Sequence, residues 1–517
     1  MHWIAKRIVL LVAVLVVGSL VLSACSAPAP SKPLTIVSTA EPSIADPAKF
    51  QDPDRWVFMS VAEPLVDHVG STADLKGLIA EKWEPVNELT WRVTLRKGVK
   101  FHDGSTMDAK AYKDVSDWLF RKDSIGAAGE MRAQLAETDG VKVVGEYQVE
   151  FTTKNPNPIF PAWLLRVPVP SAKQVREAPD SVATNLIGSG PYKIKEWRKG
   201  EYVLLEAFND YWGPKPSVKE VKFLFRKEAT VRAAMLKTGE ADIALELTAE
   251  TAVDAPKTES FQIPEVIHIR LNPGHPALQD VRVRQALIYA LDRQAIVDNL
   301  YKGFGVVMGT VVNDFVLGAN PDVKPLPFDQ AKAKQLLQEA GYKGTSPLTL
   351  YIRPARAPRE TELAEAMQRM WKEVGVEVKV QVMENTPWLD LMRLQTREPE
   401  KYKKGAIVAD MMEWPTGAEL FDSWQALDAN FSGTGANSVL INEQADPELN
   451  KMIVDAGKIS EPKQRAEALK KVWAVVGPKA YSIPLVSVKK IHGMALSVEW
   501  KPRADGMVKA QEMGFKK

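Results

Sequence analysis

The sequence has little of what marks disulfide-stabilised, cysteine-ligated metal or polyanion-binding proteins. Its 517 residues include one cysteine, Cys25, which excludes an internal disulfide framework and a cysteine-ligated zinc or iron–sulfur site. Lysine and arginine number 67 against 65 aspartate and glutamate, a formal net charge of +2. A chain whose main partner is a polyanion carries a clear basic excess, so this balance excludes a nucleic acid as that partner.

The sequence also lacks the motifs of the common catalytic and metal sites. It has no nucleophile elbow, phosphate-binding loop, paired-histidine metal helix or dinucleotide fingerprint. Its histidines are scattered without the spacing of metal ligands, at His2, His68, His102, His268, His275 and His492. We therefore predict no catalytic residue, no metal site and no cofactor.

Only the N-terminus contains a long apolar run. Lys6 and Arg7 precede the run Ile8–Leu22, and no acidic residue occurs before Cys25. Fifteen residues of helix rise only about 22 Å, short of the ~30 Å hydrocarbon core of a bilayer, so residues 1–24 are predicted to be a signal peptide. Its removal takes away two basic residues and leaves a neutral mature chain with 65 basic and 65 acidic residues.

The end of this segment points to lipid anchoring. The run closes with Leu22-Ser23-Ala24-Cys25 and is followed by a stretch rich in proline, alanine and serine up to Pro33. A cysteine after small residues resembles a bacterial lipoprotein signal, in which the cysteine takes the lipid and becomes the first residue. We expect lipidation at Cys25 and a flexible tether over residues 25–33, the alternative being an ordinary secretory signal with an incidental cysteine.

Helix and strand patterns alternate along the mature chain. A helical stripe ends at Val374, Gly375 breaks it, and the segment 376–382 then alternates valine with polar residues as a half-buried strand does. A helix is also expected to begin after Asp329 and another at Pro462. A helix that leads directly into a strand is typical of α/β layers, and the chain length requires two or three domains.

Short sequence blocks in a fixed order identify a family. They are Glu63–Val66, Leu78–Trp83, Trp91–Gly104, Gly188–Tyr192, Asn209–Trp212, Leu236–Ile243, Asp280–Leu287, Ala331–Tyr342 and Ile483–Leu485. In this order they resemble the bacterial extracytoplasmic solute-binding proteins of family 5, the peptide/nickel class that serves ABC transporters. The resemblance extends over nearly the whole mature chain.

The resemblance implies a two-lobed α/β fold, like that of periplasmic binding proteins, with a hinge and an inserted third subdomain. Lobe one is expected to be discontinuous, the inserted subdomain to span 61–184 and lobe two 276–484; the parts of lobe one are 34–60, 185–275 and 485–517. Such a protein captures a small polar solute between its lobes and delivers it to a membrane permease and its ATPase. It is expected to be a non-enzymatic monomer, lipid-anchored outside the cytoplasm.

One family feature bears on the ligand. Peptide-binding members hold the ligand's terminal amine with an aspartate in a Tyr-Pro-Asp-Pro-like loop, and the aligned segment here is Glu413-Trp414-Pro415-Thr416-Gly417. Thr416 stands where that aspartate would be. A neutral hydroxyl cannot neutralise an ammonium group, which argues against a free-amine peptide unless Glu413 acts in its place.

Further candidate ligand contacts come from the same half of the chain. Trp388 and Trp414 lie near strand ends, where ligands of α/β proteins bind, and are candidates for stacking. Arg353 and Arg356 follow a predicted strand and either clamp an anionic group or lie in solvent, and Asn437 is a further polar candidate. The expected solute is a short peptide or an amino-acid-derived compound, then a saccharide, then a nickel complex. A secreted hydrolase or chaperone on the same fold is the rival hypothesis.

Overall fold

The computed structural model describes residues 32–516 with some gaps. The gaps are residues 71, 138–139, 345, 354–357, 385, 389, 392–409, 434, 436–437, 439 and 441–445. The predicted signal peptide, Cys25 and most of the tether lie outside the described residues. No described helix is both long and apolar enough to cross a membrane.

A seven-stranded sheet gathers strands from both ends of the chain. Its order is β12 (Lys257–Phe261), β19 (Lys490–Met494), β11 (Ile243–Ala244), β1 (Leu34–Ser38), β10 (Glu220–Phe225), β9 (Tyr202–Ala207) and β8 (Tyr192–Arg198). The central strand β1 is parallel to β10 and β11, and the remaining pairs are antiparallel. The accompanying helices are α2 (Asp52–Phe58), α7 (Ala229–Thr238) and α8 (Ala249–Ala252).

A six-stranded sheet forms a second core. Its order is β14 (Gly305–Val307), β18 (Ser482–Val488), β13 (Glu265–Leu271), β17 (Met411–Gly417), β15 (Leu348–Ile352) and β16 (Val378–Val382). The helices of this part are α9 (Val281–Tyr289), α10 (Arg293–Ala295), α11 (Gln330–Glu339), α12 (Glu360–Glu373), α15 (Trp424–Phe431), α16 (Pro447–Gly457) and α17 (Pro462–Lys479).

The local predictions for this part are confirmed. Helix α12 leads through Gly375, in the left-handed conformation at φ 87°, into β16. The Asp329 side chain accepts a hydrogen bond from the backbone N–H of Lys332 and caps α11. The α12 residue Trp371 is completely buried, and its indole N–H donates to the carbonyl of Leu287 at 2.9 Å, which ties α12 to α9.

A four-stranded antiparallel sheet forms a third core between β1 and β8 in the sequence. Its order is β4 (Ala80–Pro85), β5 (Thr90–Leu95), β7 (Gln148–Thr152) and β6 (Val141–Gly145). The helices of this unit are α3 (Ala109–Leu119), α4 (Gly126–Gln134), α5 (Phe160–Trp163) and α6 (Ala172–Glu177). Two small antiparallel pairs complete the strands, β2 (Val66–His68) with β3 (Leu75–Gly77), and β20 (Val498–Glu499) with β21 (Gly514–Phe515).

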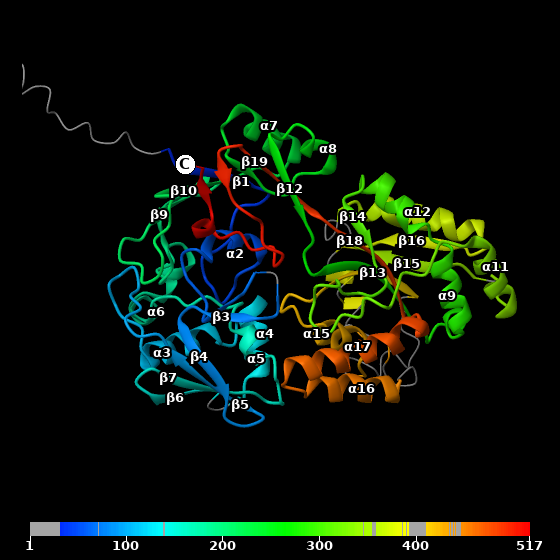
Figure 1. Cartoon of the computed structure of the whole chain (residues 1–517), viewed down its shortest axis with the longest axis horizontal. Coiled ribbons are helices and arrows are strands. Elements are labelled where there is room, and N and C mark those ends of the chain that lie inside the picture. The colour runs from blue at the N-terminus through cyan, green and yellow to red at the C-terminus, as the bar shows by residue number, and fades with distance from the viewer. Residues whose placement is uncertain are drawn as a thin grey trace, which may run out of the picture.

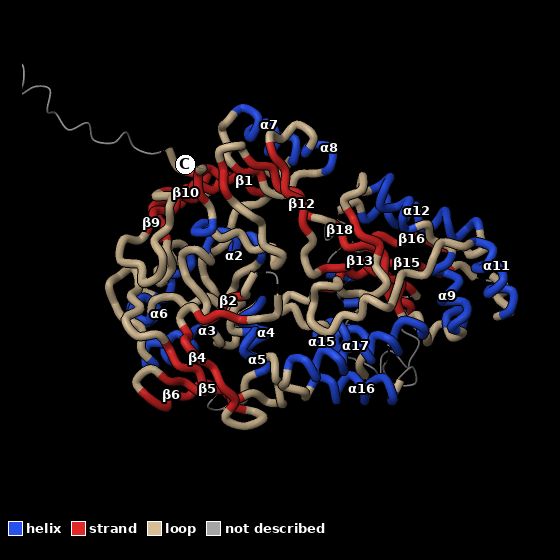
Figure 2. The backbone as a smooth tube through the Cα atoms, viewed as in Figure 1, coloured by secondary structure: helices blue, strands red, loops and turns tan. Residues whose placement is uncertain are grey.

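The three sheets occupy separate regions of the molecule. In Figure 1 the seven-stranded sheet lies at the top, the four-stranded sheet at lower left and the six-stranded sheet at right. Figure 2 shows the chain running from β12 in the seven-stranded sheet toward β13 and β18 in the six-stranded one. The assignment of a mixed α/β fold is therefore confirmed by several sheets with helices packed around them.

Strand pairing moves two of the expected domain boundaries. In the described chain, the path passes from the seven- to the six-stranded sheet at residues 262–264, between β12 and β13, and returns at Lys489, between β18 and β19. The expected boundaries at 275 and 485 assigned β13, and β18 from Leu485 onward, to lobe one. Both strands hydrogen-bond within the six-stranded sheet, a long-range pairing that the local sequence pattern does not reveal.

A buried glutamate connects the third core to the seven-stranded part. The carboxylate of Glu63 accepts hydrogen bonds from the Tyr211 hydroxyl at 2.6 Å and from the Trp212 indole at 3.1 Å. Burial raises the pKa of Glu63 to about 7, although these hydrogen bonds and the charge of Lys509 act in the opposite direction. Two of the family blocks, around Glu63 and around Tyr211–Trp212, thus meet in one network.

This network predicts a pH-dependent stability. The pKa of Glu63 is about 7 in the folded state and 4.5 ordinarily, so the folded state holds the extra proton between these values. Stability therefore falls as the pH rises through this window, by about 3 kcal/mol in total. Glu63→Gln should flatten this decline in denaturant unfolding measured from pH 4.5 to 8. Glu448→Gln, on the exposed face of α16, is the control and should leave the decline intact; an unchanged slope in Glu63→Gln would contradict the assignment.

Candidate functional site

A cleft lies where the chain crosses between the two larger sheets. It encloses about 1080 Å³ and is lined by both crossings, the end of β17, the loop 245–250 and the C-terminal segment 505–508. The third core contributes Glu130, Trp163 and Arg166, which line the edge of the cleft. This volume is at the upper end of that of small-molecule pockets.

The loop at Glu246 is held in a strained conformation on one wall of the cleft. Glu246 has φ 51°, in the left-handed region that non-glycine residues rarely adopt. The buried guanidinium of Arg232 donates to the carbonyl of Leu245 at 2.9 Å and to that of Glu246 at 2.5 Å. The Glu246 N–H also donates to Nδ1 of His492 at 3.0 Å. Strain that several contacts enforce in this way is typical of functional sites.

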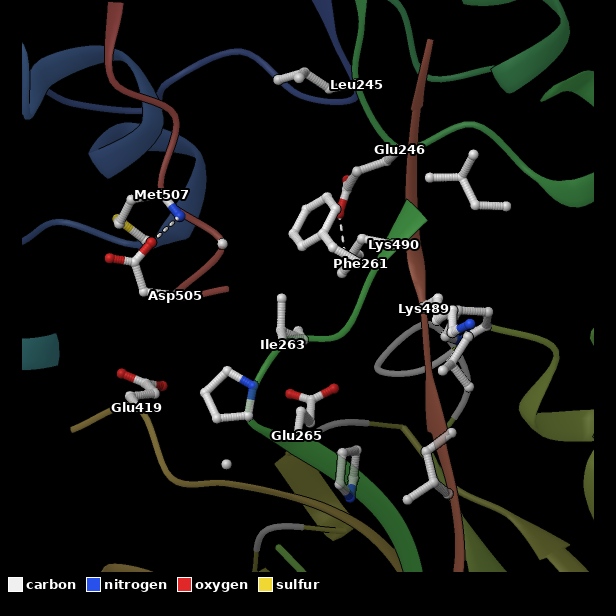
Figure 3. Close-up of a pocket in the computed structure, with 18 of the residues that line it drawn as sticks. Leu245, Glu246, Phe261, Ile263, Glu265, Glu419, Lys489, Lys490, Asp505 and Met507 are labelled. Carbon is white, nitrogen blue, oxygen red and sulfur yellow. Dashed lines mark hydrogen bonds and ion pairs between the residues drawn. The ribbon is translucent and has the colours of Figure 1, made fainter. Parts of the chain in front are cut away.

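The Glu246 carboxylate faces a lysine from the second crossing. Lys490 Nζ lies 2.6 Å from one carboxylate oxygen, and the Thr39 hydroxyl donates to the other at 3.3 Å. Burial favours the protonated acid, but the charge and hydrogen bond of Lys490 outweigh it and hold the pKa of Glu246 below its ordinary value. Figure 3 shows this pair beside Phe261 and above Glu265. Both charges are therefore present, fixed side by side.

His492 is uncharged beside this pair. Burial lowers its pKa to about 4, and its ring stacks on Trp500 with centroids 5.5 Å apart. A neutral imidazole accepts the Glu246 N–H through Nδ1, so the ring orients the loop without adding a charge. The ionic character of this wall comes from the carboxylate and the lysine.

Two further ion pairs span the cleft edges. Arg166, from the third core, lies 3.0 Å from the carboxylate of Glu419 and also pairs with Glu130. Arg359, before α12, lies 3.8 Å from Glu250 of α8. Apolar side chains separate these charged groups along the crossings: Phe261, Ile263, Pro264, Ile267, Val488 and Ile491. The cleft thus offers charges of both signs around an apolar floor.

The segment aligned with the amine-binding loop lies in β17, and its end reaches the cleft. Pro415, Thr416 and Gly417 line it, and the Thr416 hydroxyl lies 2.7 Å from Nε2 of His268. Burial, with a smaller effect of the charge of Arg270, lowers the pKa of His268 to about 3. Thr416 therefore stands at the cleft wall in an uncharged hydrogen bond.

Glu413 does not take the place of the missing aspartate in this structure. It is 2% exposed and is not among the cleft-lining residues. Side chains alternate across a strand, so Glu413 shares a face of β17 with Pro415, which lines the cleft, but it lies two residues further from the end of the strand that reaches the cleft. Its position along β17, further from the cleft than Pro415, leaves this carboxylate among the buried residues of the sheet.

The other predicted contacts do not assemble at the cleft. Trp388 is completely buried with Leu391 and Met412, and the Arg353 guanidinium lies over its ring at 4.5 Å. A solute cannot stack on a ring covered in this way. Neither residue lines the cleft. Arg356, Asn437 and the side chain of Trp414 lie outside the described part of the structure.

The residues that do line the cleft carry weak sequence signals. Glu246 and Lys490 are 244 positions apart, and only the proximity of the block Leu236–Ile243 draws attention to the loop that follows it. Trp56, on α2, is the tryptophan that lines the cleft together with Trp163. Their convergence depends on the pairing of β12 with β19 and of β1 with β11, which sequence periodicity does not show.

This arrangement is that of a solute receptor. A cleft between two sheets, joined by paired strand crossings and lined by fixed opposite charges, encloses a small polar molecule when the two sides approach each other. Among the described residues no group of three histidine, cysteine, aspartate or glutamate side chains is placed to hold a metal ion.

The comparisons with known proteins identify the family. Residues 74–438 match the model of the bacterial extracellular solute-binding proteins, family 5 (middle), and the chain belongs to this family. It is the substrate-binding protein of an ABC importer, and this family is non-catalytic. The predictions of family, receptor role and lack of enzymatic activity are thereby confirmed.

Relatives and solved structures agree with this assignment. The dipeptide-binding protein of Escherichia coli K12 is 29% identical over 431 residues, with 77% of this chain and 78% of the relative covered. The oligopeptide-binding protein AppA of Bacillus subtilis is 27% identical over 522 residues, covering 90% and 91%. HbpA2 of Haemophilus parasuis superposes with TM-score 0.81 at 23% identity over 94% of this chain and 100% of that one. DppA of Helicobacter pylori, in complex with the peptide STSA, superposes with TM-score 0.72 at 21% identity over 94% of this chain and 98% of that one.

The neutral position at Thr416 makes a testable prediction. Thr416→Asp places a carboxylate at the cleft wall next to His268, where it can pair with an ammonium group. We expect the variant to bind tri-alanine at least roughly tenfold more tightly than the parent by isothermal titration calorimetry. N-acetyl-tri-alanine, which has no ammonium group, is the control and should show no gain. Equal affinities of variant and parent for tri-alanine would show that position 416 does not face the ligand's amine.

Proposed function

We propose that the solute is a short peptide or a related amino-acid-derived compound that lies along the two strand crossings. The printed names of the relatives support this class, since they include dipeptide-, glutathione- and oligopeptide-binding proteins. The observation that carries the proposal is the fixed Glu246–Lys490 pair in the cleft wall.

A fixed pair of opposite charges suits a solute with donors and acceptors at short spacing. The Lys490 ammonium can donate to a carboxylate or carbonyl oxygen of a solute, and the Glu246 carboxylate can accept from an amine or amide N–H. Because Arg232 and His492 hold the Glu246 backbone, little ordering is required when a solute binds. A peptide presents both kinds of group along its backbone, and the apolar floor at Ile263 and Ile491 accommodates its side chains.

A saccharide fits this cleft less well. It carries no charge to complement the ion pairs, and Trp388, one of the two rings predicted to stack on a solute, is completely buried. A nickel complex would have to bring most of its own ligands. Among the described residues, the histidine that lines the cleft is His492, which already accepts a backbone hydrogen bond. A peptide or a related compound therefore fits the cleft better than a saccharide or a nickel complex.

The two lobes are proposed to move about the crossings. Residues 262–264 and Lys489 connect the seven- and six-stranded sheets, so a change of backbone angles there changes the width of the cleft. Solute contacts from both sides supply the free-energy difference that favours closure. The closed receptor then presents its solute to the permease and the ATPase subunits.

The Glu246–Lys490 pair is tested with defined solutes. Tri-alanine, glutathione, maltotriose and the nickel–histidine complex are added separately to the full chain, and unfolding temperatures are recorded. We expect tri-alanine or glutathione to raise the unfolding temperature and maltotriose to leave it unchanged. Glu246→Gln should weaken the binding of the active solute roughly tenfold or more in calorimetry, because the charged acceptor is lost.

The matched control is a comparable ion pair outside the cleft. Glu206 lies 3.0 Å from Lys193 across strands β8 and β9 and does not line the cleft. Glu206→Gln should bind the same solute with parental affinity. Stabilisation by maltotriose alone would contradict the proposal that the solute is a peptide. Equal affinities of Glu246→Gln and the parent would show that the Glu246–Lys490 pair does not bind the solute.

We further propose that Cys25 carries a lipid that anchors the protein to the outer side of the cell membrane. The proposal rests on the sequence Leu22-Ser23-Ala24-Cys25 after an apolar run and on the tether that follows. Cells expressing the full chain should incorporate an alkyne-labelled fatty acid into the protein, and Cys25→Ala should abolish labelling. The substitution Ser26→Ala is the control and should retain it. Absence of label in the parent chain would contradict lipidation.

A further inference from the structure

A loop directly after the cleft wall docks into the third core. This docking loop, residues 418–423, follows β17, whose last residues line the cleft. Its residue Leu420 is 1% exposed and belongs to the buried cluster of the four-stranded-sheet unit, together with Val93, Phe151 and Phe160. A side chain from the six-stranded part thus completes the hydrophobic core of another unit.

Polar and aromatic contacts flank this leucine. The Glu419 carboxylate lies 3.0 Å from the guanidinium of Arg166, and the Glu419 carbonyl lies 3.4 Å from Nε2 of His68. The ring of Phe421 meets that of His68 edge-on, with centroids 4.7 Å apart. His68 and Phe421 are completely buried. Three consecutive residues of the loop therefore contact the third-core unit.

The base of the docking loop is fixed to the six-stranded part. Asp422 and Arg465 of α17 form an ion pair at 2.6 Å in which both side chains are 3% exposed. The backbone carbonyl of Phe421 accepts a hydrogen bond from the N–H of Leu317 at 2.9 Å, and the N–H of Ser423 donates to the Leu317 carbonyl at 3.0 Å. Phe421 itself has φ 54°, in the left-handed region. The loop is thus a rigid projection of one part that inserts into another.

The position of this contact gives it a mechanical role. In the described chain the six-stranded part is joined covalently to the rest at residues 262–264 and at Lys489. The docking loop touches the third core at a place where no backbone connection runs. A rotation about the crossings therefore leaves the covalent links intact but must withdraw Leu420 from its site. Figure 1 shows the third core, with α4 and α5, facing the helices α15 to α17 across this contact.

We propose that the docking loop is a latch that holds the cleft closed and positions the wall at Pro415–Gly417. Exposing a buried leucine to water costs free energy in every opening event, so the latch lowers the population of the open form even without solute. The loop acts on the solute through the strand end that precedes it, and not by contact of Leu420 with the ligand. This proposal depends on the receptor role alone and is independent of the peptide class.

The test compares two leucines of the same core. Leu420→Ala and Leu119→Ala each remove a buried leucine side chain from the same cluster, but only Leu420 comes from the six-stranded part. Small-angle X-ray scattering of the solute-free full chain measures the lobe separation. We expect Leu420→Ala to increase the radius of gyration by about 1 Å, against about 23 Å for a compact chain of this length. Leu119→Ala should lower the unfolding temperature and leave the radius unchanged.

A charge reversal provides a second variant that does not touch the core. Glu419→Arg and Glu130→Arg each place a cation beside Arg166 at an exposed position, but only Glu419 lies across the contact. We expect Glu419→Arg to increase the radius of gyration as Leu420→Ala does, and Glu130→Arg to keep the parental value. Hydrogen exchange should rise in residues 418–423 in both opening variants.

The outcomes separate a latch from a structural contact. Opening in Leu420→Ala and Glu419→Arg, with parental shape in both controls, supports the latch. An unchanged radius of gyration in both variants overturns it, even if the unfolding temperature falls, since a contact that only stabilises the fold would give that result. The peptide proposal is decided separately by the solute panel, because this scattering experiment contains no solute.

Discussion

The rest of the structure depends on one antiparallel ribbon that passes from one sheet to the other. Strands β12 and β19 pair in the seven-stranded sheet, and their continuations β13 and β18 pair in the six-stranded sheet. Two chain segments therefore cross the molecule side by side, at residues 262–264 and at Lys489. The cleft lies along them, so the same backbone that links the two sheets also supplies the floor of the site. A change of backbone conformation at the crossings therefore directly changes the shape of the cleft.

Charges of the cleft are arranged in pairs, which explains how a chain with a formal net charge of only +2 presents an ionic site. Burial alone would favour the protonated form of Glu246, but Lys490 reverses this effect and keeps both groups ionised. The strained backbone at Glu246 is held by Arg232 and by a neutral His492, so the carboxylate is oriented before any solute arrives. The ion pairs at the edges, such as Arg166 with Glu419, connect separate units of the molecule.

Local features of the fold were predictable where periodicity and capping act over a few residues. The helix that ends at Gly375 and the strand β16 follow from hydrophobic spacing, and the cap at Asp329 follows from its side-chain chemistry. The residues of the site were harder to predict from the sequence. Trp388 lies near a strand end as expected, yet its ring turns into a small core beneath Arg353, because the burial of a large ring depends on packing that no local pattern encodes.

The sequence by itself predicted an export signal, and it determined the α/β class, the family and the absence of an acidic residue at position 416. These properties depend on composition, on short-range spacing or on blocks in a fixed order. Only the tertiary structure decided that Glu246 meets Lys490, that Thr416 and not Glu413 lines the cleft, and that Leu420 completes a core outside its own sheet. The physical reason is the same in each case. Strand pairing joins segments up to hundreds of residues apart, and which face of a strand meets the cleft depends on that pairing.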